Sequence, residues 1–274
     1  MKLVHATAPL QEAKFVLIGV PEESTLYTPR SGCKKGPDAF RRVAYERCVF
    51  KRKGMFSSAP ISSSFLIQKV HDYGNVERKK LAKLIEVLNG KIPILVGGDH
   101  HIITEVLKSL KDVTVIYFDA HPDVVATLHG SYGSALLDIA SDLGTCIQVG
   151  VRESPITELK NVQKNLLFSV PAEEIREQGV DVVWAQMKKK VKGKVFVSLS
   201  MDVFDPTIAP GVTAPVPGGL DYYHLRSFFR YILQELDVVG LAFMDLSPSY
   251  DHDDQTTHLA VKLFLDAMTF FPKR

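Results

Sequence analysis

The stretch VTVIYFDAHPD, residues 113–123, joins a continuous run of apolar, aromatic and β-branched residues to two aspartates and a histidine. Such a run is typical of a strand that is buried on both faces of a parallel sheet. Asp119 and His121 are two positions apart and Asp123 has the same parity, so their side chains share one face if the strand continues to this point. The stretch therefore predicts a buried parallel strand whose carboxyl end carries metal-ligating groups.

Three other apolar runs end in the same kinds of residue. Residues 92–96 lead into Asp99, His100 and His101, residues 194–199 lead into Asp202, and residues 238–244 end at Asp245. Because ligands of open parallel sheets bind beyond the carboxyl ends of the strands, we expect these side chains to meet at one edge. Carboxylates brought together repel one another, and a divalent cation removes that conflict. Mixed carboxylate and imidazole ligands favour Mn²⁺, with Zn²⁺, Fe²⁺ or Co²⁺ as substitutes.

The rest of the chain alternates short apolar runs with longer amphipathic segments. Further strands are predicted at residues 14–20, 146–151 and 166–170, and helices at residues 76–88, 102–110, 172–190 (interrupted near Gly179), 222–236 and 255–268. This alternation predicts an α/β protein with a parallel sheet covered on both faces, in a single domain over residues 1–274. Residues 30–41 and the proline-rich residues 207–219 are expected to be specialised connections, the second a rigid loop of the kind that shapes sites.

The chain has 274 residues, of which 46% are hydrophobic, with 33 basic and 31 acidic side chains. This composition excludes a disordered chain and also a nucleic-acid binder, which usually carries a marked basic surplus. The longest apolar runs have about seven residues, whereas a membrane span needs about 20, and the N-terminus lacks the apolar core of a signal peptide. We expect a soluble cytoplasmic protein with three reduced cysteines and with neither nucleic-acid nor membrane partners.

Three motifs, in this order along the chain, resemble those of the ureohydrolases, the family of arginase, agmatinase and formiminoglutamase. The motifs are GGDH at residues 97–100, DAHPD at residues 119–123 and SLSMDVFDPTIAPG at residues 198–211. The resemblance implies an arginase-like, three-layer α/β/α fold with a mainly parallel eight-stranded sheet, a homo-oligomer and a dinuclear manganese site. In such enzymes a hydroxide that bridges the metals attacks the carbon of a guanidinium or formimino group, so the implied partner is a small-molecule amidine.

The resemblance also implies a ligand set by position in the motifs. His100, Asp119 and Asp123 would hold one metal, and Asp119, His121 and Asp202 would hold the other. The chain departs from the family at Ser200, where ureohydrolases carry an aspartate that bridges both metals. Because a hydroxyl brings no charge, we expect weaker metal binding, and one, two or no bound ions all stay open.

Two positions implied to act in catalysis also differ from the family. Asp245 stands where ureohydrolases carry a glutamate that clamps the guanidinium, and its shorter side chain withdraws the carboxylate by roughly 1.5 Å. Tyr132 stands where a histidine often assists proton transfer, although His129 takes that position in an alternative alignment. The expected catalytic residues are therefore Asp245 and Tyr132.

We expect a metal-dependent hydrolase of this family that cleaves a C–N bond in a linear amidine similar to agmatine, arginine or formiminoglutamate. Two alternatives stay open. One is a single-metal amide hydrolase or deacetylase on the same scaffold, and the other is a catalytically weak or silent family member with a degenerate metal site. The metal content per chain would separate them.

Overall fold

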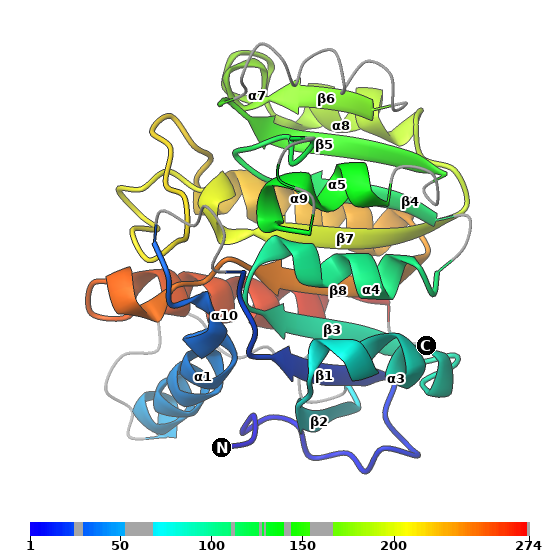
Figure 1. Ribbon diagram of the computed structural model, residues 1–274, viewed down its shortest axis with the longest axis vertical. Helices are drawn as coiled ribbons and strands as arrows, with labels where there is room; N and C mark the ends of the chain where they lie inside the picture. The colour runs from blue at the N-terminus through cyan, green and yellow to red at the C-terminus, as the bar shows by residue number, and fades with distance from the viewer. Residues whose placement is uncertain are drawn as a thin grey trace.

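The computed structural model describes residues 1–24, 30–52, 68–110, 113–125, 128, 130–139, 144–153 and 167–272. Within these ranges eight strands form one sheet in the order β2-β1-β3-β8-β7-β4-β5-β6, and every neighbouring pair is parallel. The strands are β1 (Phe15–Val20), β2 (Val70–Asn75), β3 (Ile92–Gly97), β4 (Val113–Phe118), β5 (Thr145–Val151), β6 (Leu167–Pro171), β7 (Lys194–Ser200) and β8 (Val238–Met244). The carboxyl ends of β3, β8, β7 and β4 therefore lie next to one another in the middle of the sheet (Figure 1).

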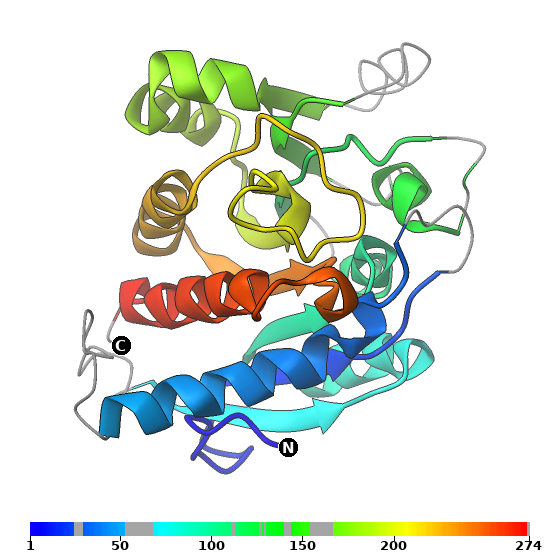
Figure 2. The same cartoon turned by 90° about the vertical axis from the view of Figure 1, so that its left-hand side faces the viewer.

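Helices cover both faces of the sheet, which gives three layers (Figure 2). One face carries α1 (Gly36–Arg52), α7 (Ala172–Gln178), α8 (Val180–Lys188), α9 (Tyr222–Glu235) and α10 (Gln255–Phe270). The other face carries α3 (Leu81–Val87), α4 (Ile103–Leu107) and α5 (Ala135–Asp138). Two 3-10 helices extend the strand ends that matter most below, η3 (His100–Ile102) after β3 and η6 (Met201–Val203) after β7.

The strands supply two hydrophobic cores because their alternate side chains point to opposite faces. In β4, Ile116 and Phe118 belong to the core under α9 and α10, whereas Val115 and Tyr117 belong to the core under α3 and α4. Burial on both faces explains why β4 reads as an unbroken apolar run. The predicted three-layer fold with an eight-stranded parallel sheet is thus confirmed.

Three elements differ from the sequence-based prediction, and one of them is the short helix α5, which was not predicted. Residues 30–41, expected to be a connection, contain η1 (Cys33–Lys35) and the start of α1 at Gly36, followed by Pro37, a residue that suits the first helical turn. Strand β2 was not predicted, because Asp72 and Asn75 interrupt its apolar pattern at the edge of the sheet. The helix expected over residues 172–190 is divided at Gly179, as predicted.

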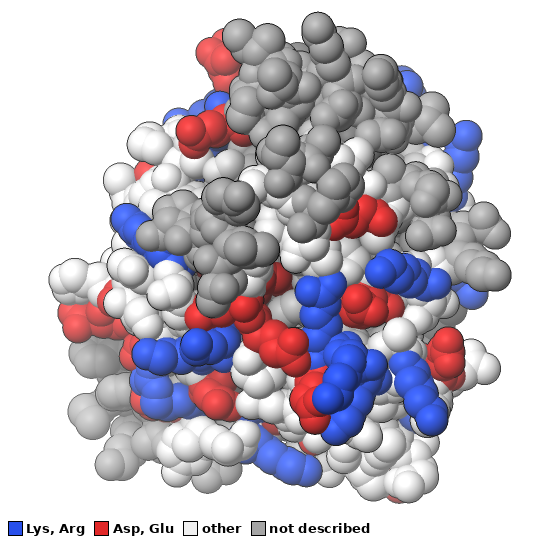
Figure 3. All heavy atoms as spheres, viewed as in Figure 1, with Lys and Arg blue, Asp and Glu red and all other residues white. Residues whose placement is uncertain are grey.

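The described residues on one face of the molecule include charges of both signs (Figure 3). On the face shown in Figure 3, basic and acidic side chains lie close together rather than in separate patches. This distribution agrees with the near balance of 33 basic and 31 acidic residues. None of the helices in the described ranges is both long and apolar enough to span a lipid bilayer.

Candidate metal centre

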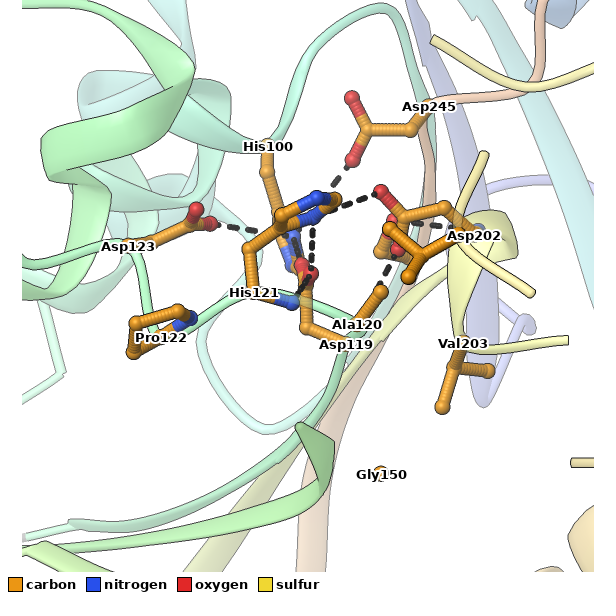
Figure 4. A network of polar contacts seen from close by, with 12 residues as sticks. His100, Asp119, Ala120, His121, Pro122, Asp123, Gly150, Asp202, Val203 and Asp245 are labelled. Carbon is orange, nitrogen blue, oxygen red and sulfur yellow. Dashed lines mark hydrogen bonds and ion pairs between the residues drawn. The ribbon is translucent and has the colours of Figure 1, made fainter. Parts of the chain in front are cut away.

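Polar side chains from four neighbouring strand ends converge in one buried cluster (Figure 4). The cluster contains His100 after β3, Asp119, His121 and Asp123 after β4, Asp202 after β7 and Asp245 after β8. All of these residues except His121 are less than 5% exposed. The convergence expected from the sequence therefore occurs, and it occurs at the centre of the sheet.

A first group of potential ligands consists of Asp119, His121 and Asp202. The Nδ1 atom of His121 lies 3.3 Å from an oxygen of Asp119 and 3.3 Å from an oxygen of Asp202. The backbone N–H of His121 also donates to Asp119 at 2.7 Å, which fixes the carboxylate against the loop. One ligand atom from each of the three residues lies within 4.8 Å of the others. The structure thus brings together three residues that the sequence assigned to one metal.

A second group consists of His100, Asp119 and Asp245, with the same mutual spacing of 4.8 Å or less. Nδ1 of His100 lies 2.7 Å from Asp119, 3.5 Å from Asp245 and 3.8 Å from Asp123. The sequence had assigned Asp123 to this metal and Asp245 to the substrate. In the structure Asp123 accepts a hydrogen bond from the hydroxyl of Tyr117, and Asp245 is the carboxylate that completes the compact group.

The buried charges of the cluster shift one another's pKa values. Burial raises the pKa of Asp123 and Asp245 well above the ordinary value, and nearby carboxylates raise them further, Asp119 in the first case and Asp202 in the second. Burial lowers the pKa of His121, but hydrogen bonds to Asp119 and Asp202 outweigh it and raise the pKa to about 12. Protons thus neutralise part of this cluster when no metal is bound. Divalent cations can take their place, because metal binding to such ligands releases protons.

The donor set fits a hard divalent cation. Its atoms are carboxylate oxygens and imidazole nitrogens without any thiolate, a combination suited to Mn²⁺. The Oδ1 atom of Asp245 is shielded from solvent and has no hydrogen-bonding partner among the described residues. A buried carboxylate oxygen without a partner is costly, and a cation would satisfy it.

A shell of hydrogen bonds fixes the loops that carry the ligands. The guanidinium of Arg152 donates to the backbone carbonyls of Asp202, at 2.8 Å, and Val216, at 2.6 Å, and so ties η6 to the proline-rich loop. Asp205 accepts hydrogen bonds from the backbone N–H groups of Gly218 and Gly219 across the same loop. The sequence pattern gave no sign that Arg152 would support Asp202.

The remaining predicted residues have varied outcomes. Tyr132 lies in η5 (Tyr132–Ser134), but its side chain and all of His129 lie outside the described residues. Ser200 is fully buried at the end of β7, and its hydroxyl accepts a hydrogen bond from the backbone N–H of Asp202 at 3.3 Å. His101 belongs to neither ligand group, and its Nε2 atom lies 2.8 Å from the carboxylate of Asp138.

Comparison with known proteins gives a consistent result. A family model described as the arginase family matches residues 13–269. The N(1)-aminopropylagmatine ureohydrolase of Thermus thermophilus is 26% identical over 91% of this chain and 88% of its own length. The agmatinase of Sodalis glossinidius is 28% identical over 94% of this chain and 87% of its own length. The crystal structure of the agmatine ureohydrolase of Thermoplasma volcanium superposes with a TM-score of 0.83 at 25% identity, over 98% of this chain and 94% of that one.

Proposed function

The chain belongs to the arginase family, and from this premise we propose that it hydrolyses a C–N bond in a small linear amidine. The relatives named above are ureohydrolases of aminopropylagmatine and agmatine. Their names favour a guanidine attached to an aliphatic amine as the substrate class. A substrate of this class carries no phosphate and needs no nucleotide site.

We further propose that the cluster binds divalent manganese. Asp119, His121 and Asp202 would hold one ion, and His100 and Asp119 would contribute to a second. Bound cations of this kind would lower the pKa of water and stabilise negative charge that develops at the reacting carbon. Tyr132 is proposed, from its position in the sequence, to assist proton transfer.

The protein's own contribution is to hold the ligands in place before any ion arrives. Arg152 fixes the backbone at Asp202 through its carbonyl, and the N–H of His121 fixes the carboxylate of Asp119. Because these side chains are already held in position, no conformational entropy has to be lost at the moment when the reacting groups bind.

The single observation that carries this proposal is the meeting of His121 with Asp202, which are 81 positions apart in the sequence and 3.3 Å apart in space. Strands β4 and β7 are hydrogen-bonded neighbours, so their carboxyl ends place these two residues at one point. Three carboxylates with two imidazoles, at the carboxyl ends of β3, β4 and β7, have no evident structural purpose without a cation.

The proposal is tested by a substrate panel with the manganese-loaded protein. Urea release is measured from aminopropylagmatine, agmatine, guanidinobutyrate and arginine, and glutamate release from formiminoglutamate. The expected result is manganese-dependent hydrolysis of at least one compound, abolished in the Asp202→Asn variant. Product release no greater than that of Asp202→Asn for every compound would contradict the proposed function.

A second candidate function is favoured by Ser200, which removes a bridging carboxylate from the site expected of the family. In that case the chain is a catalytically weak or silent member that keeps the fold. Metal content per chain distinguishes the two, because a silent protein with a degenerate site would retain almost no manganese after dialysis.

A further inference from the structure

Ser200 and Asp245 stand side by side at the ends of neighbouring strands. The register of β7 and β8 pairs Ser200 with Met244, so Asp245 is the next residue beyond that pair. Ser200 and Asp245 are both buried at this point, with less than 5% of their surface exposed. The position that lacks a carboxylate is therefore next to a carboxylate from the adjacent strand.

Asp245 is directed into the cluster and held there. Its Oδ2 atom lies 3.5 Å from Nδ1 of His100 (Figure 4). Its backbone has a left-handed conformation, with φ of 61°, and its N–H donates to the carbonyl of Gly98 at 2.8 Å. Its other oxygen, Oδ1, is buried without a hydrogen-bonding partner in the part of the chain that the structure describes. This setting orients the carboxylate of Asp245 toward the positions of the other potential metal ligands.

Asp123, the carboxylate that the sequence assigned to the same metal as His100, is already engaged in a hydrogen bond. The hydroxyl of Tyr117 donates to one of its oxygens, and the ring of Tyr117 stacks on His100 with 4.1 Å between the ring centroids. Nδ1 of His100 is closer to Asp245, at 3.5 Å, than to Asp123, at 3.8 Å. The tyrosine thus holds Asp123 while Asp245 faces the imidazole.

We propose that Asp245 is a manganese ligand that replaces the carboxylate missing at Ser200, so that the negative charge has moved from β7 to β8 within the same site. This inference rests on the proposed function, because it concerns the metal of that site. Asp119, Asp123, Asp202 and Asp245 then supply four carboxylates, the number expected when position 200 is an aspartate. Asp245 is in this case a metal ligand instead of the substrate clamp that the sequence implied, and the amidine is recognised by other groups.

Manganese binding to three variants tests directly whether Asp245 replaces the carboxylate that is missing at position 200. The variants are Asp245→Asn, Ser200→Asp and the double variant, and binding is measured by titration calorimetry and by elemental analysis after dialysis. We expect the wild type to bind two ions per chain and Asp245→Asn to lose one, or to bind it at least about tenfold more weakly. The double variant should regain the second ion. A matched control is Asp253→Asn, since Asp253 is also an aspartate with positive φ (47°) but is exposed.

Two results would overturn the proposal. One is an Asp245→Asn variant that binds two manganese ions with the affinity of the wild type. The other is a wild type that binds one manganese ion together with a Ser200→Asp variant that binds two, a result that does not depend on how Asp245→Asn folds. In that case the site of the wild type lacks a carboxylate ligand that Asp245 does not replace. We expect two bound manganese ions per chain both in the wild type and in Ser200→Asp.

The same samples separate this proposal from the proposed function. If manganese binding follows the pattern above but no amidine in the panel is hydrolysed, the ligand assignment holds and the activity is wrong. If an amidine is hydrolysed but Asp245→Asn keeps both ions, the activity holds and the ligand assignment is wrong.

Discussion

At the scale of single residues, Asp119 connects the two ligand groups. One of its oxygens lies 2.7 Å from Nδ1 of His100 and the other lies 3.3 Å from Nδ1 of His121. Burial alone would raise the pKa of Asp119, but hydrogen bonds to these two histidines lower it, so the carboxylate is charged at neutral pH. Asp119 is therefore the residue whose loss should affect every metal in the site.

The Asp119→Asn variant is expected to lose manganese at both positions and to lower amidine hydrolysis by about a thousandfold or more, because charge stabilisation at the reacting centre is removed. Elemental analysis and product release measure the two effects. Asp253→Asn serves as the control and should keep both its bound manganese and its rate of amidine hydrolysis. Two ions per chain in Asp119→Asn would show that the carboxylate is not shared.

The types of ligand and the group of Asp119, His121 and Asp202 could be predicted from the sequence, but the carboxylate that completes the group around His100 could not. Aspartates and histidines that follow apolar runs identify the site. Each run predicts a buried strand, and ligands of parallel sheets bind at the edge formed by the carboxyl ends of the strands. Whether Asp123 or Asp245 faces His100 depends on two left-handed backbone positions, with φ of 50° and 61°, and on the Tyr117 hydroxyl. Neither the two backbone conformations nor the hydrogen bond from Tyr117 can be predicted from the spacing of residues in the sequence.

At the scale of elements, Gly98 joins three strand ends. Its N–H donates to the carbonyl of Val20, the last residue of β1, at 3.0 Å, and its carbonyl accepts from the N–H of Asp245 after β8 at 2.8 Å. A Cβ atom at this position would come within 1.6 Å of the carbonyl oxygen of Glu22. The absence of a side chain thus allows the loops that carry His100 and Asp245 to pack against β1.

Gly98→Ala is expected to destabilise the protein by about 1 to 3 kcal/mol or more through overpacking and to weaken manganese binding, because the loops must separate. Urea unfolding and calorimetry measure these effects. Gly90→Ala is the control: Gly90 has a φ of 79° with open space around it, so its replacement strains the backbone without a clash and should leave metal binding unchanged. Unchanged manganese affinity in Gly98→Ala would contradict the packing argument.

A buried ion pair anchors α1 to the edge strand β2. Arg41 donates to both oxygens of Asp72, at 2.8 and 2.9 Å, and both side chains are almost fully buried. Burial alone would raise the pKa of Asp72, but the hydrogen bonds from Arg41 and from the backbone of Leu3 lower it. This contact explains why a polar segment without an apolar run becomes a strand, a tertiary effect that the local sequence does not reveal.

Asp72→Asn is expected to lower the free energy of unfolding at pH 7 by about 3 to 5 kcal/mol, because the buried guanidinium of Arg41 loses the carboxylate that is buried with it and is left with the exposed carboxylate of Asp38 at 3.8 Å. Since the folded pKa of Asp72 is below the unfolded value of about 3.9, this contribution is complete above that pH and is lost as the pH falls through the folded pKa. The difference between wild type and variant, from urea unfolding at several pH values, should therefore narrow in acid. A difference that stays constant down to the lowest pH would contradict this assignment.

At the scale of the whole molecule, the order of the strands creates the site. β3, β8, β7 and β4 are consecutive in the sheet, although β5 and β6 come between β4 and β7 along the chain. Each of the four strands ends in at least one of the clustered residues. The layers and most of the strands were predictable because buried parallel strands read as apolar runs. The strand order was not predicted, because no local sequence pattern states which strands pair.

Metal loading should stabilise the entire fold, because ions relieve the repulsion among buried carboxylates and bind only the folded chain. At a free manganese concentration 100 times the dissociation constant, one site contributes about 2.7 kcal/mol, which raises the melting temperature by several degrees for a chain of this size. Thermal unfolding with manganese and with chelator measures the shift. Asp119→Asn should show no such shift, and equal melting temperatures for the wild type in both conditions would argue against a built metal site.

The most direct measurement is anomalous diffraction at the manganese absorption edge from crystals of the manganese-loaded protein. We predict a peak between Nδ1 of His121 and the carboxylates of Asp119 and Asp202, with a second beside His100. Manganese-loaded crystals with no anomalous peak among these side chains would contradict the account.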